Sequence, residues 1–365
     1  MNDPLNMSVN FKLDVDDPFK GHFYSRVSNP NVEELEKQLA RLENGRFCLA
    51  FSSGMAAITT LFWTVLEPDD HIIISNDCYT GTYSFCLNLM KKWNIHTTFI
   101  DHRDPKNIYK TLQQDTRLIF IETPSNPTLY LCDIMEISKI IKSFNQKTWN
   151  KRILLAVDNT FATPILQNPL ELGADFSIHS TTKAINGHSN AIGGAVITDN
   201  PDWHRKLLEN RTTLGTIQQP MNAWLTLTGS RTIKERLTKQ CETTQKIAEW
   251  LEQQKPEIEY VLYSGLKSFP QKDLAEKQMK NAGTMISFAV KGNLENAKDF
   301  LKALNKITVA VSLGSVDSYI EIPYTMSHHD IALGRIPDNL IRLSVGLESF
   351  EELKEDLERG LTAIK

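Results

Sequence analysis

The sequence predicts an α/β protein in which helices cover both faces of a mostly parallel sheet, followed by a smaller α+β domain. Between about residue 45 and residue 200, short β-rich runs alternate with helical patterns, which is typical of βαβ units. From about Thr226 the pattern changes to a long amphipathic helical stretch and then to a mixed region. The 365 residues also exceed what one compact core accommodates. We therefore expect a large N-terminal domain and a smaller C-terminal domain.

The strands of the large sheet are predicted from short runs of apolar and β-branched residues. These runs are Arg46–Phe51, His71–Ser75, Thr97–Asp101, Leu118–Glu122, Ile153–Asp158, Asp175–His179 and Gly194–Thr198. Several of them end in a polar or acidic residue. Because ligands of open parallel sheets bind at the C-terminal ends of the strands, we expect the functional site there.

The C-terminal region predicts fewer strands. A long amphipathic helix is expected over Ser230–Gln254, and strands over Met285–Val290 and Ile307–Ser312. The segment Lys255–Gln271 is the most loop-like part of this half, and a last helix is expected over Phe350–Ile364. Together these elements predict a small α+β domain.

The composition favours a globular protein that binds a small ligand. Hydrophobic residues make up 41% and charged residues 23%, which are ordinary values for a folded chain. With 40 Lys and Arg against 44 Asp and Glu, the formal charge of −4 provides no field that attracts nucleic acid or an anionic membrane. The apolar runs are far shorter than the roughly 18 residues of a membrane span. We expect no nucleic-acid or membrane partner.

The cysteines and the N-terminus predict a cytoplasmic location. The five cysteines are scattered and form no Cys-x-x-Cys pair, so neither a disulfide framework nor a zinc site is expected. The segment from Met1 to Asp17 carries acidic residues and lacks the basic start and apolar run of a secretory signal.

The first motif with chemical meaning is Ser52–Ala57, which follows a predicted strand and opens an apolar helix. Free N–H groups and the helix dipole make such a turn an anion site, although Ser-Ser-Gly is also an ordinary N-cap. The motif is neither the dinucleotide-binding glycine fingerprint nor a Walker loop, which argues against a nicotinamide dehydrogenase or a nucleoside triphosphate site.

The second motif is the strand and turn Leu154–Thr160, which places Asp158 at the end of an apolar strand. An acid in this position can hold a cationic ring nitrogen or a metal, or can simply cap a turn. Carboxylates and histidines with ligand spacing do not accompany it, so we expect no metal.

The third motif is Phe176–Ala184, in which Lys183 follows a strand and the hydroxyl residues Ser180, Thr181 and Thr182. A lysine that is partly desolvated has a lowered pKa and becomes a nucleophile, whereas a solvated surface lysine is the plainer interpretation. A phosphate cradle, an acid for a ring nitrogen and an amine for an aldehyde are together the parts that hold pyridoxal phosphate.

Nine segments carry a family resemblance, in unbroken order from about residue 21 to the C-terminus. They are Tyr24–Pro30, Ser53–Ala57, Tyr79–Tyr83, Glu122–Thr128, Val157–Pro164, His179–Lys183, Ser312–Gly314, Met326–His328 and Ile341–Gly346. The sequence resembles the Cys/Met-metabolism, or trans-sulfuration, family of pyridoxal-phosphate enzymes. The resemblance implies a fold-type I pyridoxal-phosphate-dependent transferase. Its motifs divide the chain into a short N-terminal arm over residues 1–30, a cofactor-binding domain over 31–230 and a C-terminal domain over 231–365.

The resemblance also implies roles for individual residues. Lys183 would bond covalently to the cofactor aldehyde and later remove the Cα proton, Asp158 would pair with the pyridine nitrogen, and Tyr79 would stack on the ring. Ser312 and Arg342 would bind the substrate, with Arg342 holding its α-carboxylate. The other residues implied at the cofactor are Tyr24, Arg26, Gly54, Met55, Asn126, Thr160, Ser180 and Thr182.

In the family, residues in the positions of Tyr24 and Arg26 reach the cofactor of a neighbouring subunit. The resemblance therefore implies a homodimer or homotetramer with shared active sites. About 20 residues precede Tyr24, whereas the family's arm is longer, so the tetramer is the less secure expectation.

The sequence departs from the family pattern at four positions near the expected site. Val311 stands where cystathionine γ-synthases and γ-lyases carry Glu, and it resembles methionine γ-lyases and the sulfhydrylases. Thr80 replaces a Gly, and Gly81 stands where methionine γ-lyases carry Cys, which counts against methionine. Asn190 replaces an Asp.

We expect an enzyme that acts on an amino acid by γ-elimination or γ-replacement, of the cystathionine γ-lyase or γ-synthase type. The alternatives are an O-acetylhomoserine sulfhydrylase, which Val311 favours, a cystathionine β-lyase or a methionine γ-lyase. From another class, a non-catalytic homologue could retain the cofactor, but the set Tyr79, Asp158, Lys183 and Arg342 argues against it.

Overall fold

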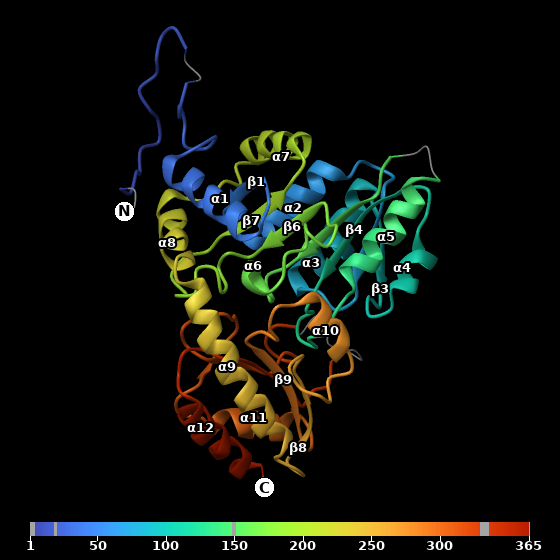
Figure 1. The fold of residues 1–365 in the computed structure, drawn as a ribbon, viewed down its shortest axis with the longest axis vertical. Coiled ribbons are helices and arrows are strands. Elements are labelled where there is room, and N and C mark those ends of the chain that lie inside the picture. Colours follow the sequence, from blue (N-terminus) through green and yellow to red (C-terminus); the bar gives the residue numbers. More distant parts are fainter. Residues whose placement is uncertain (1–3, 18–19, 148–150, 329–335, 365) are drawn as a thin grey trace.

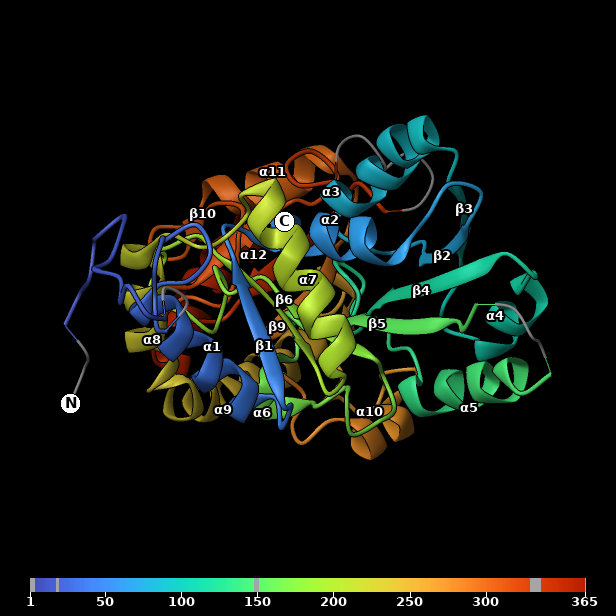
Figure 2. The same ribbon diagram turned by 90° about the horizontal axis from the view of Figure 1, so that it is seen from above.

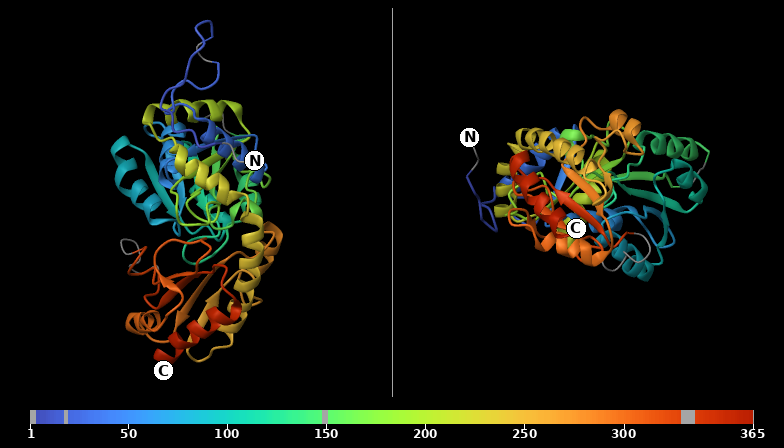
Figure 3. Two further views of the ribbon diagram at one scale, coloured as in Figure 1. Left: turned by 90° about the vertical axis from the view of Figure 1, so that its left-hand side faces the viewer. Right: turned by 90° about the horizontal axis from the view of Figure 1, so that it is seen from below.

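The computed structural model describes residues 4–17, 20–147, 151–328 and 336–364. The described residues form a seven-stranded sheet in the N-terminal part and a five-stranded sheet in the C-terminal part (Figure 1). The helix α9 (Ile233–Glu252) runs from the first part into the second (Figure 3). The described residues before residue 30, namely 4–17 and 20–29, include a loop that extends away from the body (Figure 1). None of the described helices is long and apolar enough to cross a membrane.

The large sheet has the strand order β1-β7-β6-β5-β4-β2-β3. Its strands are β1 (Phe47–Phe51), β2 (His71–Ser75), β3 (His96–Ile100), β4 (Thr116–Glu122), β5 (Leu154–Asp158), β6 (Phe176–His179) and β7 (Gly194–Thr198). Each agrees with a predicted strand to within two residues at either end. The strands pair in parallel, except that β7 is antiparallel to both β1 and β6. The predicted mostly parallel sheet is confirmed.

Both faces of this sheet are buried, which explains why its strands are almost wholly apolar. Ile72 and Ile74 of β2 lie in a core with α2 (Gly54–Val65), while Ile73 between them lies in a second core with α5 (Ile134–Asn145). Figure 2 shows α2 and α5 on opposite sides of β4 and β5. The other helices of this part are α1 (Pro30–Leu42), α3 (Thr80–Ser84), α4 (Pro105–Thr111), α6 (Thr163–Leu166), α7 (Pro201–Leu214) and α8 (Pro220–Ser230).

The smaller sheet has the order β10-β11-β12-β9-β8. Its strands are β8 (Ile258–Leu262), β9 (Met285–Val290), β10 (Thr308–Val309), β11 (Tyr319–Glu321) and β12 (Leu340–Ser344). The helices α10 (Lys272–Gln278), α11 (Leu294–Lys302) and α12 (Phe350–Ala363) belong to the same part. Buried residues of α9, α11 and α12 pack with β9 and β12 in one core, so the predicted smaller α+β unit is confirmed.

The predictions for this half were wrong at two places. Lys255–Gln271, predicted as a loop, contains β8, whose register shifts between Ile258 and Tyr260 and so breaks the alternation that marks a strand. The strand predicted over Ile307–Ser312 is reduced to Thr308–Val309. Ser312, at the end of the predicted range, has a φ of 94° that an extended strand does not adopt. The short strand β11 and the strand β12 were not predicted as strands.

The division proposed at residue 230 falls between the end of α8 at Ser230 and the start of α9 at Ile233. The three domain ranges themselves stay a prediction.

Candidate active site

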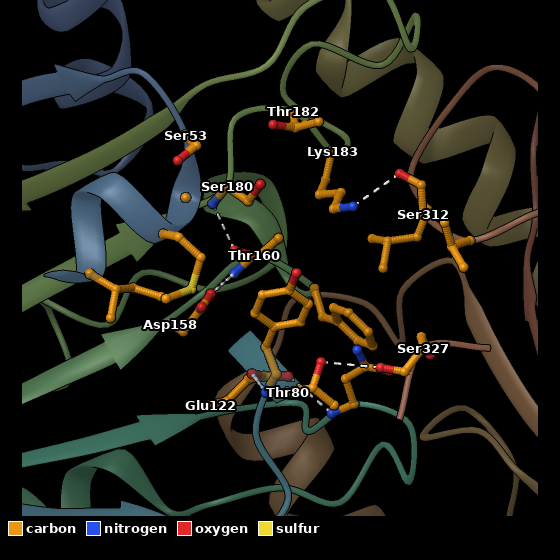
Figure 4. Close-up of a pocket in the computed structure, with 18 of the residues that line it drawn as sticks. Ser53, Thr80, Glu122, Asp158, Thr160, Ser180, Thr182, Lys183, Ser312 and Ser327 are labelled. Atoms are coloured by element: carbon orange, nitrogen blue, oxygen red, sulfur yellow. Dashed lines mark hydrogen bonds between the residues drawn. The ribbon is translucent and has the colours of Figure 1, made fainter. Parts of the chain in front are cut away.

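A pocket lies where the C-terminal ends of β4, β5 and β6 face the loops around β12 (Figure 4). Most of the predicted site residues line it, namely Gly54, Met55, Tyr79, Asn126, Asp158, Thr160, Ser180, Thr182, Lys183, Ser312 and Arg342. We call the side formed by Gly54, Asp158, Ser180 and Lys183 the strand-end side. The side formed by Ser312, Ser327 and Arg342 is called the C-terminal side.

The strand-end side begins with a turn that suits an anion. Ser53 caps α2, with its hydroxyl accepting a hydrogen bond from the Ala56 N–H at 3.0 Å. Close packing requires glycine at two positions: a Cβ on Gly54 would lie 2.9 Å from Ser180 Cβ, and one on Gly194 would lie 2.2 Å from the Ser53 carbonyl oxygen. The start of a twelve-residue helix therefore meets the hydroxyl residues Ser180 and Thr182.

Asp158 ends β5 beneath this turn. The Thr160 N–H donates to Asp158 Oδ1 at 3.0 Å, and the Ser180 N–H donates to Thr160 Oγ1 at 2.9 Å. Burial raises the pKa of Asp158, whereas the hydrogen bonds from Thr160 act in the opposite direction. A cation held against Asp158 would favour its ionised form, as a protonated ring nitrogen would.

Lys183 projects into the pocket from the segment after β6. Its Nζ donates to Ser312 Oγ at 2.9 Å, a contact between the two sides of the pocket. Burial, together with the nearby charge of Arg342, lowers the pKa of Lys183 to about 8, while Glu321 opposes the shift. A lysine with this pKa is partly in the neutral amine form near pH 7, which a nucleophile for an aldehyde requires.

Arg342 lies in β12 and is almost wholly buried. Its Nη1 donates to Asn126 Oδ1 at 2.8 Å, and its Nη2 donates to the Ser312 carbonyl oxygen at 2.9 Å. The Nη2 also pairs with Glu321 Oε1 at 3.0 Å, while the buried Nε has no hydrogen-bond partner. Arg342 is thus held in place and retains a donor for a ligand.

Ser312 connects the two basic side chains. Its hydroxyl accepts from Lys183, and its carbonyl oxygen accepts from Arg342. The φ of 94° at Ser312 lies in a region that non-glycine residues rarely adopt. Such strain is typical of functional sites, and here it accompanies the placement of an amine and a guanidinium around one residue.

Glu122 is a pocket residue whose importance the sequence analysis missed. Its Oε2 accepts from the Tyr79 N–H at 2.7 Å and its Oε1 accepts from the Asn126 N–H at 3.0 Å. Burial raises the pKa of Glu122 well above its usual value, and the charge of Asp158 adds to this effect. The sequence offered one indication of its importance: Glu122 ends β4, as Asp158 ends the neighbouring strand β5. The two residues are register partners.

A second missed group lies behind the C-terminal side. The Ser327 hydroxyl donates to Glu321 Oε1 at 2.5 Å and contacts His328 Nδ1 at 2.8 Å. Burial, helped by the charge of Arg342, lowers the pKa of His328 to about 4, so this imidazole is neutral at pH 7. Ser327 and His328 belong to a family-like segment, whereas nothing in the sequence around Glu321 distinguished it from a surface acid.

Tyr24 and Arg26 do not line this pocket. The Arg26 guanidinium donates to the Thr212 carbonyl oxygen at 2.8 Å and lies 5.5 Å from the centre of the Tyr24 ring. Among the described residues that line the pocket, the basic side chains are Lys183 and Arg342. Among the described residues, no arginine of the same chain therefore reaches the turn at Gly54.

The donor set fits pyridoxal phosphate and offers little to a metal. A helix N-terminus with hydroxyl residues suits a phosphate, Asp158 suits a ring nitrogen, and Lys183 suits an aldehyde. Over the described ranges, no group of three His, Cys, Asp or Glu residues is placed to hold a metal ion.

Comparisons with known proteins agree with this interpretation of the pocket. A family model described as "Cys/Met metabolism PLP-dependent enzyme" matches residues 1–362. An L-methionine gamma-lyase of Treponema denticola is 39% identical over 348 residues, covering 94% of this chain and 85% of the relative. A cystathionine beta-lyase of Coxiella burnetii is 39% identical over 349 residues, covering 94% of this chain and 88% of the relative.

A solved structure shares the whole fold. The cystathionine gamma synthase from Xanthomonas oryzae pv. oryzae, in complex with aminoacrylate and cysteine, superimposes with a TM-score of 0.95 and 36% identity, covering 100% of this chain and 93% of that one. The predicted fold type, cofactor dependence and enzyme class are confirmed. The chain belongs to the Cys/Met-metabolism family of pyridoxal-phosphate-dependent enzymes.

Proposed function

We propose that this enzyme catalyses γ-elimination or γ-replacement on a sulfur amino acid or a related homoserine derivative, of the cystathionine γ-lyase or γ-synthase type. The observation that carries the proposal is the convergence of Lys183 and Arg342 on Ser312, at 2.9 Å each. An α-carboxylate bound by Arg342 would bring the adjoining Cα within reach of the Lys183 amine.

The cofactor would be held by the strand-end side. When bound, pyridoxal phosphate supplies an aldehyde that condenses with amines and a ring that accepts electrons from Cα. The N–H groups at the start of α2, with Ser180 and Thr182, would bind its phosphate. Asp158 would hold the ring nitrogen in its protonated form, and Tyr79 would cover the ring.

Lys183 would then move protons. Its pKa of about 8 lets the neutral amine remove the Cα proton near neutral pH. The same group would then move protons at Cβ, whose deprotonation lets the γ-substituent leave, and would deliver a proton to the leaving group. Ser312 Oγ, which accepts from Nζ, would orient the amine during these transfers. The buried setting limits access of water to the reacting atoms.

The pocket mouth bears on the choice of substrate. Ile192, Val311 and Met326 line the pocket and are 58%, 53% and 38% exposed, so apolar side chains face the place where a γ-substituent would lie. An apolar surface favours an uncharged substituent over the zwitterionic end of cystathionine. This supports a second candidate activity, the addition of a thiol or sulfide to an O-acylated homoserine. Methionine, the substrate in the name of one relative, also has an uncharged γ-substituent.

Gly81 weighs against the methionine activity. A Cβ at this position would lie 2.5 Å from Tyr79 Cε1 and 3.1 Å from Met55 Sδ. The cysteine that methionine γ-lyases carry here would therefore need a different placement of the Tyr79 ring. The loop of this chain is packed for a glycine.

We further propose an assembly with shared sites, a homodimer or homotetramer. No arginine of the described residues of the same chain lies at the turn around Gly54, while Tyr24 and Arg26 are exposed residues of the N-terminal arm. A second copy placing its Arg26 at the cradle would supply the missing positive charge. A cytoplasmic location is supported by the five cysteines, all of which are free and buried.

The test is a substrate panel on the purified enzyme. Cystathionine, cysteine, methionine and O-acyl homoserines are supplied in turn, with and without a thiol, and oxo acid, ammonia and thioether are measured. We expect turnover of γ-substituted amino acids, a yellow protein, and covalent fixation of the cofactor on Lys183 by borohydride. A colourless protein that takes up no pyridoxal phosphate, or turnover confined to β-substituted amino acids, would contradict the proposal.

A further inference from the structure

The two sides of the pocket are joined by a hydrogen bond that depends on one unusual side chain. Thr80, the first residue of α3, donates its hydroxyl to the Ser327 carbonyl oxygen at 3.1 Å, across a separation of 247 residues (Figure 4). Thr80 stands where the family pattern has Gly, which has no hydroxyl to donate. The bond therefore depends on this chain's departure from the pattern.

On the C-terminal side the bond continues to Arg342. The Ser327 hydroxyl donates to Glu321 Oε1 at 2.5 Å, and the same oxygen pairs with Arg342 Nη2 at 3.0 Å. Glu321 and Arg342 are also register partners on adjacent strands β11 and β12. A shift of Ser327 would therefore move Glu321, which competes with a substrate carboxylate for the Arg342 guanidinium.

On the strand-end side the bond begins beside Tyr79. The Tyr79 N–H donates to Glu122 Oε2 at 2.7 Å, and the Asn126 N–H donates to the other oxygen of the same carboxylate, Oε1. The Asn126 side chain in turn accepts a hydrogen bond from Arg342. Arg342 is therefore connected to the Tyr79 loop by two routes, one through Asn126 and one through Glu321, Ser327 and Thr80. The second route exists only while Thr80 carries a hydroxyl.

We propose that Thr80 is a positioning residue for substrate binding: by holding Ser327, it sets the Glu321 and Arg342 pair in the arrangement that accepts the α-carboxylate. This inference depends on the proposed function, in which Arg342 binds that carboxylate. Thr80 has no part in the proton transfers of Lys183. Its loss should weaken binding of the amino acid and leave the chemical step nearly unchanged.

The Ser327 segment has other hydrogen bonds that preserve its fold. The Met326 N–H donates to the Ile322 carbonyl oxygen at 3.1 Å, and the His328 N–H donates to the Pro323 carbonyl oxygen at 2.8 Å. Because these bonds lie within the segment, removing the Thr80 hydroxyl changes where the segment sits relative to Tyr79 and leaves its local turn intact.

The experiment compares Thr80→Val, Thr80→Ser and Thr80→Gly in the cofactor-loaded enzyme. Val matches the shape of Thr without the hydroxyl, and Ser keeps the hydroxyl. We expect Thr80→Val and Thr80→Gly to raise KM about fivefold to tenfold with kcat within about twofold, as loss of one hydrogen bond predicts. Thr80→Ser should restore KM to within about twofold of the parent.

A second readout avoids turnover altogether. Glycine, which has a carboxylate but no leaving group, is titrated while the cofactor absorbance is followed, and its Kd should rise with KM in the Thr80→Val protein. Thr238→Val is the matched control, since the Thr238 hydroxyl bonds only within α9, to the Lys234 carbonyl oxygen at 2.8 Å on the exposed face.

The outcomes separate the two proposals. If the parent enzyme shows neither turnover nor a glycine response, the proposed function fails and this inference fails with it. If the parent responds and Thr80→Val has the parent's KM and Kd, the inference alone is overturned. A Thr80→Ser protein as impaired as Thr80→Val overturns it as well, because the hydroxyl would then not be the active feature.

Discussion

The strand-end side and the C-terminal side of the pocket are built by different means. Apart from Lys183, the strand-end side uses short side chains and backbone N–H groups at the ends of buried parallel strands, and its geometry follows from the sheet itself. The C-terminal side uses long charged side chains, Arg342 and Glu321, which hold each other and Ser312. The first side is placed by the backbone, whereas the second is placed by a network of side chains.

This difference predicts different responses to substitution. A site placed by the backbone tolerates changes around it but loses its chemistry when a reacting group is removed. A site placed by paired charges is sensitive to the loss of any partner, because the remaining buried charge is left uncompensated.

Removal of the amine from the strand-end side should have the largest effect. We expect Lys183→Ala to reduce kcat by at least about a thousandfold with every substrate of the panel, because the proton transfers lose their base. Steady-state assays of oxo acid and thioether measure the loss. Lys291→Ala, at an exposed lysine, is the control and should keep full activity. Retention of more than about a tenth of the parent kcat would assign the proton transfers elsewhere.

Changes to Arg342 examine the C-terminal side. We expect Arg342→Lys to lower kcat/KM about a hundredfold, because a lysine keeps the charge but cannot reproduce the contacts to Asn126 and Ser312 together with a carboxylate. Cofactor absorbance should remain that of the parent, which would separate this side from the strand-end side. Equal loss of cofactor binding in this variant would show that the two sides are not independent.

The pH dependence of cofactor capture tests the electrostatic link between the sides. In the cofactor-free protein Lys183 has a pKa of about 8, so the reactive amine is scarce below that pH and predominant above it. The rate of pyridoxal phosphate capture should rise roughly tenfold per unit below pH 8 and level off above it. Arg342→Gln should move the midpoint upward, since Arg342 contributes to the lowered pKa. A midpoint near the ordinary lysine value would contradict this account.

Mixed oligomers test whether the strand-end side is completed by another subunit. Arg26→Ala alone should weaken cofactor binding about tenfold, as loss of one charge-assisted contact predicts. When Arg26→Ala and Lys183→Ala subunits are mixed in equal amounts, about one quarter of the sites should carry neither change if sites are shared. At a cofactor concentration well below the Kd of the Arg26→Ala protein, activity measured after remixing should then exceed that of either variant alone. No recovery, with mixed oligomers demonstrated, would place each site within one chain.

Much of the strand-end side was predictable because each of its residues stands at or shortly after the end of a buried strand in the sequence. A buried parallel strand is a continuous apolar run, and the residue after it lies at the sheet edge, so Asp158 and Lys183 could be placed before the structure was seen. Glu122 satisfied the same rule and was missed only because no role was sought for it. The bulged strand β8 and the two-residue β10 were not predictable from alternation, since neither displays it.

The sequence by itself determined the alternation of strands and helices, the three motifs at the strand ends and the family, because each depends on residues close together in the chain. Only the tertiary structure decided which side chains meet. It pairs Glu321 with Arg342, places Ser312 in contact with both Arg342 and Lys183, and brings the Thr80 hydroxyl to Ser327. The reason is physical. The Ser312–Lys183 and Thr80–Ser327 hydrogen bonds join residues 129 and 247 positions apart, and distances of about 3 Å between such residues arise only when the two sheets are packed against each other. Glu321 and Arg342 meet because β11 and β12 are adjacent strands of the smaller sheet, a pairing that the local sequence pattern did not predict.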